Sequence, residues 1–253
     1  MSIRSTKDFE GMRHASEVVG ETLAKMIQHA APGMSTKELD EFGFEILSSY
    51  GANPAPNKEY DFPGWTCISV NNEAAHGIPS STRILQEGDL VNVDVSAEVN
   101  GYYGDNGSSF VLGHDIQNLN PLVNASKEIL LAAISRIKGG VRIADVGGYI
   151  ENEAKRKGFT TLKNLVGHGI GMKLHDEPFE LPNFNDRHNR NRFKVNTVVA
   201  LETFISTRSR YVHTMADGWT LKAKDGSFVA QHEHTLIVTD DQPIILTSNN
   251  GIC

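Results

Sequence analysis

Carboxylates inside apolar strand-like runs are the chemical feature that stands out in this sequence. Asp94 lies among valines in the run LVNVDVSAEV, where burying an unpaired carboxylate is costly. Asn100 and Gly101 follow, and this dipeptide favours a two-residue hairpin loop. In that register Asp94 and Asp105 become diagonal neighbours on one face of the hairpin. Adjacent carboxylates raise each other's pKa unless a cation separates them, so the pair predicts a cation site; the alternative for Asp105 is a hairpin-edge aspartate in water.

The second half of the chain offers two more carboxylates in apolar runs. Glu202 lies in VVALETFI and Glu233 in VAQHEHTLIV. Successive side chains of a strand point to opposite faces. If Glu233 points into a cleft, His232 and His234 point away from it, and we expect these two histidines to have supporting or structural roles.

One histidine lies between glycines in the run VGHGIGMKLHDEP. The glycines beside His168 let the backbone approach a ligand while the imidazole projects; the alternative is a loose phosphate loop or an ordinary loop histidine. Four carboxylates and one imidazole form a hard donor set that suits Mn, Fe(II), Co or Zn rather than Cu. Their charge matches two divalent ions, which lie roughly 3.5–4 Å apart in two-metal sites.

Two further histidines are not needed as ligands. His76 in NNEAAHGIP and His175 in KLHDEP each precede a proline closely. We expect them to form hydrogen bonds with a substrate, one at a carbonyl oxygen as charge develops and one near an amide nitrogen. The alternative for each is a loop histidine whose hydrogen bonds are satisfied within the protein.

The elements that position these residues follow from periodicity and repetition. Helical spacing predicts helices over 9–30, 35–50, 120–137 and 143–157, the first two opened by capping boxes at 5–8 (STKD) and 35–38 (STKE). The second should bury Leu39, Phe42, Ile46 and Tyr50. The order helix, helix, hairpin occurs twice, and aligning DLVNVDVS with TVVALETF places Asp94 on Glu202. We therefore expect an α+β fold with two pseudo-symmetric halves, roughly 1–115 and 116–253, whose helices cover a curved antiparallel sheet.

Composition limits the classes of function. A net charge of −7 argues against binding to nucleic acid or to a membrane surface. No apolar run approaches the roughly 20 residues that span a bilayer, and the first residues lack the apolar core of a signal peptide. The only cysteines are Cys67 and Cys253, too few for a disulfide framework, and Cys253 as last residue does not fit a prenylation box. These features predict a reduced, cytoplasmic protein.

The motifs NVDVSAEVNGYYGDNGSSF, GHGIGMKLHDEP, ALETFIS and VAQHEHT resemble those of the type I methionine aminopeptidases, in their short bacterial form. The resemblance covers essentially the whole chain and implies a pita-bread fold, with 1–253 as one catalytic domain. One departure is Thr203, where the family usually has proline after the glutamate.

The resemblance also implies roles. Asp94 would bind one metal ion, Asp105 and Glu233 would bridge two, and His168 and Glu202 would complete the shell of the other. His76 and His175 match the substrate-contacting histidines. The residues that match the methionine pocket are Phe62, Cys67 and Trp219, the last in a longer loop.

The function implied is removal of the initiator methionine from nascent polypeptides by a water activated by two metal ions, with Glu202 as the base. Ribosome docking stays open, and a monomer is the default expectation. Two other functions are compatible with the same fold. Prolidases and Xaa-Pro aminopeptidases share the fold and ligands but usually carry an extra N-terminal domain, for which 253 residues leave no room. Binding modules of the same fold that have lost their metals should lack ligands, and here all five are present.

Overall fold

The computed structural model describes residues 1–252, so Cys253 and the expectation about it lie outside the described residues. The helices are α1 (Thr6–His29), α2 (Thr36–Ser49), α3 (Ala55–Tyr60), α4 (Asn120–Ile134) and α5 (Ile143–Arg156), with a 3₁₀ turn η1 (Ser248–Asn250). The long strands are β4 (Leu90–Val99), β5 (Tyr102–Val111), β8 (Asp176–Pro182), β9 (Val198–Ser206) and β12 (Val229–Ile237). The short strands are β1 (Asn53–Pro54), β2 (Cys67–Val70), β3 (Glu73–Ala75), β6 (Thr160–Thr161), β7 (Val166–Gly169), β10 (His213–Thr214), β11 (Leu221–Lys222) and β13 (Ile244–Ile245).

The helix starts follow the predicted caps with one difference. Ser35 and Glu38 form the complete capping box of α2. At α1 the Ser5 hydroxyl accepts from the Asp8 backbone N–H, whereas the Asp8 carboxylate accepts from the backbone N–H of Arg4 at 2.9 Å. The α1 cap therefore differs from a capping box in one bond: the Asp8 carboxylate binds the N–H of Arg4, the residue before the N-cap, instead of the N–H of Ser5.

The prediction that Tyr50 faces inward was wrong. Tyr50 is the C-cap residue of α2, its side chain is 38% exposed, and its hydroxyl donates to Glu21 on α1 at 2.7 Å. The polar end of the ring finds its partner at the surface, and Leu47 fills the core in its place.

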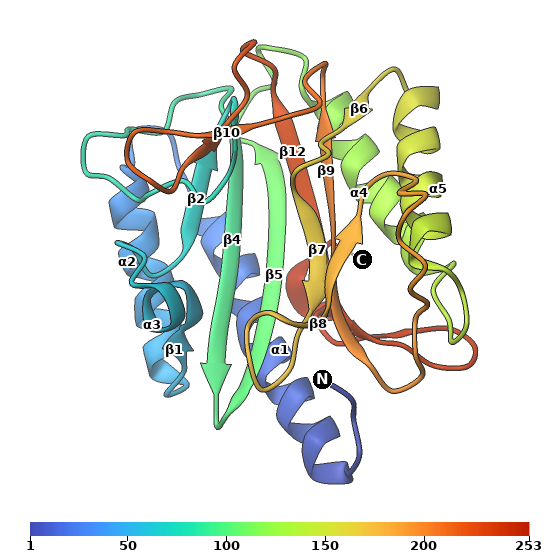
Figure 1. Ribbon diagram of the computed structural model, residues 1–253. Helices are drawn as coiled ribbons and strands as arrows, with labels where there is room; N and C mark the ends of the chain where they lie inside the picture. The colour runs from blue at the N-terminus through green and yellow to red at the C-terminus, as the bar shows by residue number, and fades with distance from the viewer. Residues whose placement is uncertain (253) are drawn as a thin grey trace.

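The principal sheet runs in the order β1-β4-β5-β12-β9-β7-β8, and all its neighbouring strands are antiparallel (Figure 1). The first hairpin, β4–β5, turns at Asn100 and Gly101, both at positive φ, as a two-residue loop requires. Asp94 pairs with Gly107 and Asp105 with Ser96, which confirms the predicted register. The second hairpin-like pair, β9 and β12, meets the first where β5 lies beside β12.

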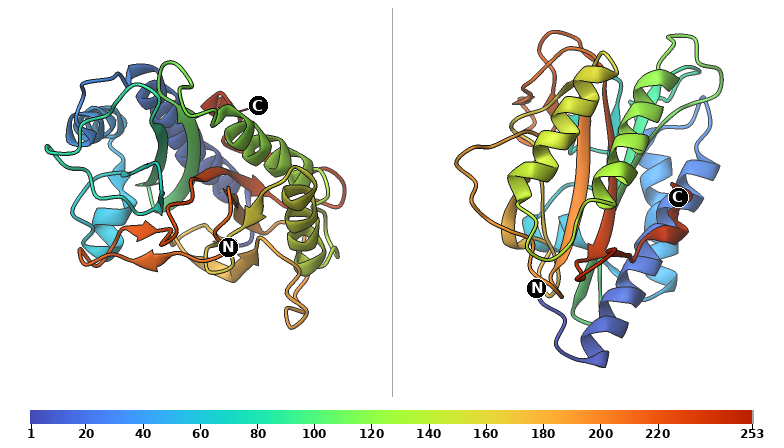
Figure 2. Two further views of the ribbon diagram at one scale, coloured as in Figure 1. Left: turned by 90° about the horizontal axis from the view of Figure 1, so that it is seen from above. Right: turned by 90° about the vertical axis from the view of Figure 1, so that its right-hand side faces the viewer.

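Helices cover one face of the sheet (Figure 2). One buried core lies beneath α1 and α2 against β4 and includes Leu23, Leu39 and Val93. The other lies beneath α4 and α5 against β9 and β12 and includes Ile129 and Leu201. Each half therefore contributes one helix pair, as expected for a pseudo-symmetric α+β fold, while the first core also takes in residues of the second half such as Ile170 and Val198. No helix within residues 1–252 is long and apolar enough to cross a membrane.

Candidate metal and active site

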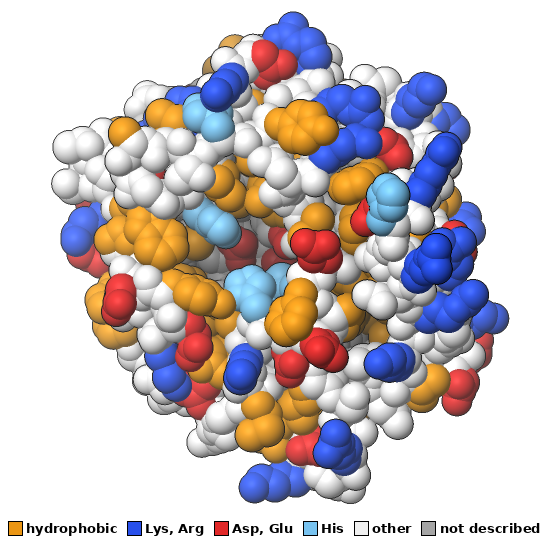
Figure 3. Space-filling view, in the orientation of Figure 1, with side chains coloured by type: hydrophobic (Ala, Val, Ile, Leu, Met, Phe, Trp, Pro, Cys, Tyr) orange, Lys and Arg blue, Asp and Glu red, His pale blue; other side chains and the backbone are white. Residues whose placement is uncertain are grey.

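The face of the sheet away from the helices is hollowed (Figure 3). Acidic side chains lie in the hollow, with histidine and apolar side chains around it. The cavity measures about 280 Å³, and all the residues predicted above as ligands, substrate contacts or pocket walls line it.

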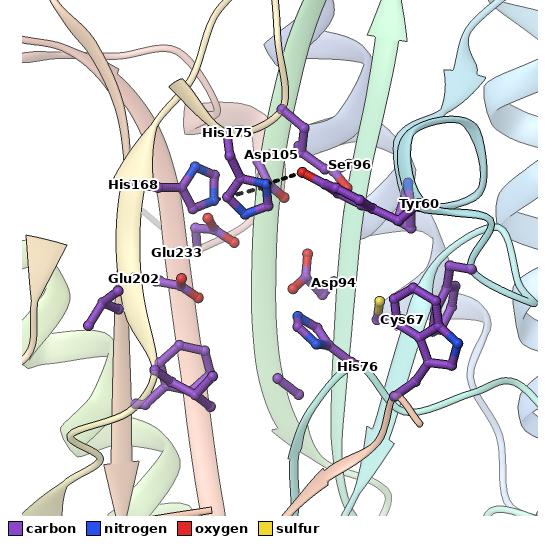
Figure 4. Close-up of a pocket in the computed structure, with 18 of the residues that line it drawn as sticks. Tyr60, Cys67, His76, Asp94, Ser96, Asp105, His168, His175, Glu202 and Glu233 are labelled. Atoms are coloured by element: carbon purple, nitrogen blue, oxygen red, sulfur yellow. Dashed lines mark hydrogen bonds and ion pairs between the residues drawn. The ribbon is translucent and has the colours of Figure 1, made fainter. Parts of the chain in front are cut away.

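The four carboxylates come from the four central strands. Asp94 on β4 and Asp105 on β5 are diagonal neighbours, because each pairs with a residue two positions from the other. Glu202 on β9 and Glu233 on β12 pair directly. Strand alternation puts all four on the pocket side, where they face one another (Figure 4).

His168 reaches the carboxylates from β7. Its Nε2 atom lies 3.5 Å from Oδ2 of Asp105, and ligand atoms of Asp105, His168 and Glu233 all lie within 4.8 Å of one another. Its Nδ1 lies 3.0 Å from the Gly169 carbonyl oxygen. Because a carbonyl oxygen can only accept, Nδ1 carries the proton and Nε2 presents a free lone pair to the carboxylates, as a metal ligand must.

The glycines around His168 lie close to the backbone of the neighbouring strands. A Cβ atom on Gly167 would lie 2.6 Å from the Ala200 carbonyl oxygen of β9, and one on Gly169 would lie 2.3 Å from that of Glu177 on β8. These glycines let β7 pass closely between its neighbours. That they also let the backbone approach a metal stays a prediction.

Burial makes this acidic cluster costly without a cation. Burial, together with the neighbouring carboxylates, raises the pKa of Asp94, Glu202 and Glu233 well above the usual range. Burial raises the pKa of Asp105 to about 7. No lysine or arginine is found among the described residues that line the pocket. The cluster must therefore hold protons or cations, and its oxygen-rich donor set with one imidazole fits divalent metal ions.

Gln231 was not predicted from the sequence and lies at the centre of the carboxylates. Its Nε2 donates to Glu202 at 2.9 Å, and to Asp94 and Glu233 at 3.4 Å each. Its Oε1 accepts from Nδ2 of Asn92 at 2.8 Å, which fixes the orientation of the amide. The available signal was its position two residues before Glu233 in a strand, because that spacing puts both side chains on the same face.

The two substrate-contact candidates lie at the mouth of the pocket. His76 has a positive φ of 54°, a strained conformation for a residue with a side chain, and Gly77 follows because a Cβ atom there would lie 2.2 Å from the Ile68 carbonyl oxygen. His175 lies against His168, with ring centroids 4.1 Å apart. Withdrawal from water and the neighbouring His168 lower the pKa of His175 to about 4, so its ring is neutral at pH 7.

The predicted methionine-pocket residues lie together beside the carboxylates. The rings of Phe62 and Trp219 meet edge to face, with centroids 5.3 Å apart and planes at 88°. Cys67 on β2 pairs with Asp94, and burial and that carboxylate raise the pKa of its thiol. Trp219 therefore joins the wall even though its loop is distant in sequence.

Residues predicted to lie outside the cavity do so. His232 and His234 are buried, and neither lines the pocket; Nδ1 of His234 lies 2.8 Å from the Thr247 hydroxyl. Thr203 on β9, at the position of the usual proline, pairs with His232 on β12, and its hydroxyl lies 3.0 Å from that of Ser126 on α4. The strand therefore continues regularly through this substitution.

Residues 10–240 match the model of metallopeptidase family M24. The chain belongs to this family. The expectation of a metal-dependent hydrolase is thereby confirmed at the level of the family. The methionine aminopeptidase 2 of Bacillus subtilis (strain 168) is 46% identical over 98% of this chain and 99% of its own. A methionine aminopeptidase of Staphylococcus epidermidis is 38% identical over 98% of both chains.

Solved structures agree on the architecture. The crystal structure of a methionine aminopeptidase from Thermotoga maritima superposes with a TM-score of 0.93 at 32% identity, covering 98% of this chain and 99% of that one. The prolidase of Pyrococcus furiosus superposes with a TM-score of 0.78 at 20% identity, and 65% of it is covered. The expected pita-bread fold is confirmed, and the type I assignment stays a prediction.

Proposed function

We propose that this chain is a metal-dependent aminopeptidase that removes N-terminal methionine from polypeptides. The observation that carries the proposal is the convergence of four carboxylates and His168 beside an apolar wall of Phe62 and Trp219. The names of the relatives, which match this chain over nearly its whole length, support the same activity.

The five predicted ligands would together hold two divalent ions, Co, Mn, Fe(II) or Zn. These ligands are Asp94, Asp105, His168, Glu202 and Glu233. When bound, such ions supply positive charge that polarises a carbonyl group and lowers the pKa of water towards about 7. Gln231 would hold the Glu202 carboxylate in place through its 2.9 Å hydrogen bond.

Side chains of the protein would transfer the proton, orient the peptide bond and enclose the methionine side chain. The Glu202 carboxylate would take a proton from the attacking water and pass it to the leaving nitrogen. His175 would donate a hydrogen bond to the scissile carbonyl oxygen as negative charge develops, and His76 would orient the amide nitrogen. Phe62, Cys67 and Trp219 would enclose the methionine side chain, whose sulfur makes favourable contacts with aromatic rings.

The cellular setting that we propose follows the same reasoning. The substrates would be the N-termini of new polypeptides in the cytoplasm, met by a monomeric enzyme of type I. Direct binding of nucleic acid or membrane is not part of the proposal, because a net charge of −7 would repel phosphate groups.

The proposal is tested by comparing the rates at which the protein hydrolyses the peptides Met-Ala-Ser and Ala-Pro-Ala. Mn or Co is added, and samples with EDTA are the control. We expect cleavage of Met-Ala-Ser alone, abolished by EDTA. Cleavage of only Ala-Pro-Ala would instead favour a prolidase-like activity. Cleavage of neither peptide with any of the four metals would favour a binding module.

A further inference from the structure

Tyr60 contacts the site from an element that carries none of the predicted site residues. It is the last residue of α3, and its hydroxyl oxygen lies 2.6 Å from Nδ1 of His175, which is 115 residues away in sequence (Figure 4). The tyrosine ring is 45% exposed and lies on the rim of the pocket. An exposed tyrosine needs no internal partner, so this contact calls for an explanation.

The position of Tyr60 is fixed from both sides. Lys58 pairs with Glu98 on β4 at 2.9 Å, and Glu59 accepts a hydrogen bond from the Tyr103 hydroxyl on β5. Within α3, Nδ2 of Asn57 donates to the carbonyl oxygen of Phe62, which follows the helix, at 3.0 Å. The short helix is therefore anchored to the strands that carry the carboxylates.

We propose that Tyr60 is a positioning residue that selects the tautomer of His175. A neutral imidazole has one nitrogen that donates and one that accepts. A tyrosine hydroxyl can donate or accept, and we infer that Tyr60 donates to Nδ1 of His175. The proton of His175 is then on Nε2, free to donate to a substrate oxygen in the pocket. The inference rests on the proposed function only in its last step, the use of that proton.

The neighbouring ring shows the opposite arrangement. The Gly169 carbonyl requires the proton of His168 on Nδ1 and leaves Nε2 as a lone pair for a metal. Two imidazoles with centroids 4.1 Å apart thus need opposite tautomers, one as ligand and one as donor. A separate hydrogen-bond partner for each ring supplies that difference, and the partner of His175 is the Tyr60 hydroxyl.

The test compares the wild-type protein with Tyr60→Phe, both labelled with ¹⁵N-histidine and loaded with Zn. Protonated and unprotonated ring nitrogens have well-separated ¹⁵N resonances, and the His175→Gln spectrum assigns the signals. We expect His175 of the wild type to be protonated at Nε2 alone, and Tyr60→Phe to mix the two tautomers. With Met-Ala-Ser we expect kcat to fall roughly tenfold, the loss of about one hydrogen bond, with KM little changed.

Tyr50→Phe is the matched control, because it removes a similarly exposed hydroxyl that hydrogen-bonds to Glu21. It should alter neither the His175 resonances nor kcat. A wild-type His175 protonated at Nδ1 would overturn the proposal, as would an unchanged tautomer in Tyr60→Phe, whatever its kcat. If the wild type cleaved no peptide, the proposed function would fail, while the spectra would still decide the role of Tyr60.

Discussion

Glu202 is the carboxylate whose surroundings best separate a catalytic role from a purely structural one. It lies opposite Glu233 on the neighbouring strand and receives a hydrogen bond from Gln231. Its pKa is raised by burial and by the charge of Asp94, so it holds a proton readily. A group with these properties can take up and release a proton within the pocket.

Replacing Glu202 with glutamine should therefore remove activity without harming the fold. We expect kcat on Met-Ala-Ser to fall by about 10²–10⁴-fold, the usual contribution of a general base. The melting temperature of the metal-free variant should equal or exceed that of the wild type, because glutamine has no proton to lose and burial and Asp94 disfavour a charged group at this position. Turnover at the wild-type rate would refute the assignment of Glu202 as the base.

Gln231 should matter through the ligands that it holds. Gln231→Leu removes the donor shared by three carboxylates, and we expect metal affinity to fall by about 10–100-fold, as for other residues that orient ligands. Titration calorimetry with Mn measures this effect. The same exchange at the exposed Gln28 on α1 should leave affinity unchanged, and equal affinities for both variants would contradict the role given to Gln231.

At the scale of elements, close strand contacts decide where His168 and His175 lie. Strand β7 passes between β9 and β8 with glycines on both sides of His168. Gly169→Ala would place a Cβ atom 2.3 Å from the Glu177 carbonyl oxygen, so β7 and β8 must separate.

For Gly169→Ala we expect a loss of about 1–3 kcal/mol in the free energy of unfolding, together with weaker metal binding. Urea denaturation and Mn titration measure the two effects. Gly148→Ala is the control, since its nearest neighbour would be a side-chain atom at 3.2 Å and alanine favours the surrounding helix α5. Equal stability of the two variants would show that β7 has more room than the structure indicates.

Some of these elements could be predicted from the sequence and others could not. The hairpin that pairs Asp94 with Gly107 is local, since Asn100 and Gly101 set the turn and alternation sets the faces. The contact between Tyr60 and His175 depends on how α3 docks on the sheet, and nothing near either residue indicates it. Gln231 was missed for another reason. Its spacing from Glu233 places it on the pocket face of β12, but a neutral amide does not by itself indicate a role beside metal ligands.

At the scale of the whole molecule, the acidic cluster couples stability to pH and metal. Asp105 has an ordinary pKa of 3.8 that rises to about 7 in the metal-free fold. Between these values the folded chain holds more protons than the unfolded chain, so stability is lost as pH rises. The slope is about 1.4 kcal/mol per pH unit for each extra proton.

We therefore expect the melting temperature of the EDTA-treated wild type to fall, relative to that of EDTA-treated Asp105→Asn, between about pH 4 and about pH 7. The comparison isolates Asp105 from the buried histidines, whose lowered pKa values act in the opposite direction. Adding Mn should raise the melting temperature most at the upper end, where the carboxylates are free of protons and metal binds only the folded chain. Scanning calorimetry measures both effects. A wild type that gains stability relative to Asp105→Asn over this range would contradict the raised pKa of Asp105.

Strand β12 lies between β5 and β9 at the centre of the sheet, yet it is the last long strand in the sequence. During synthesis on the ribosome, β5 and β9 are complete before β12 exists, so each of them has an unpaired edge where β12 will later lie. Such edges invite pairing with other chains. Synthesis of a single late segment thus closes the sheet and delivers Glu233 at the same moment, so an incomplete copy has neither a continuous sheet nor the means to cut peptides.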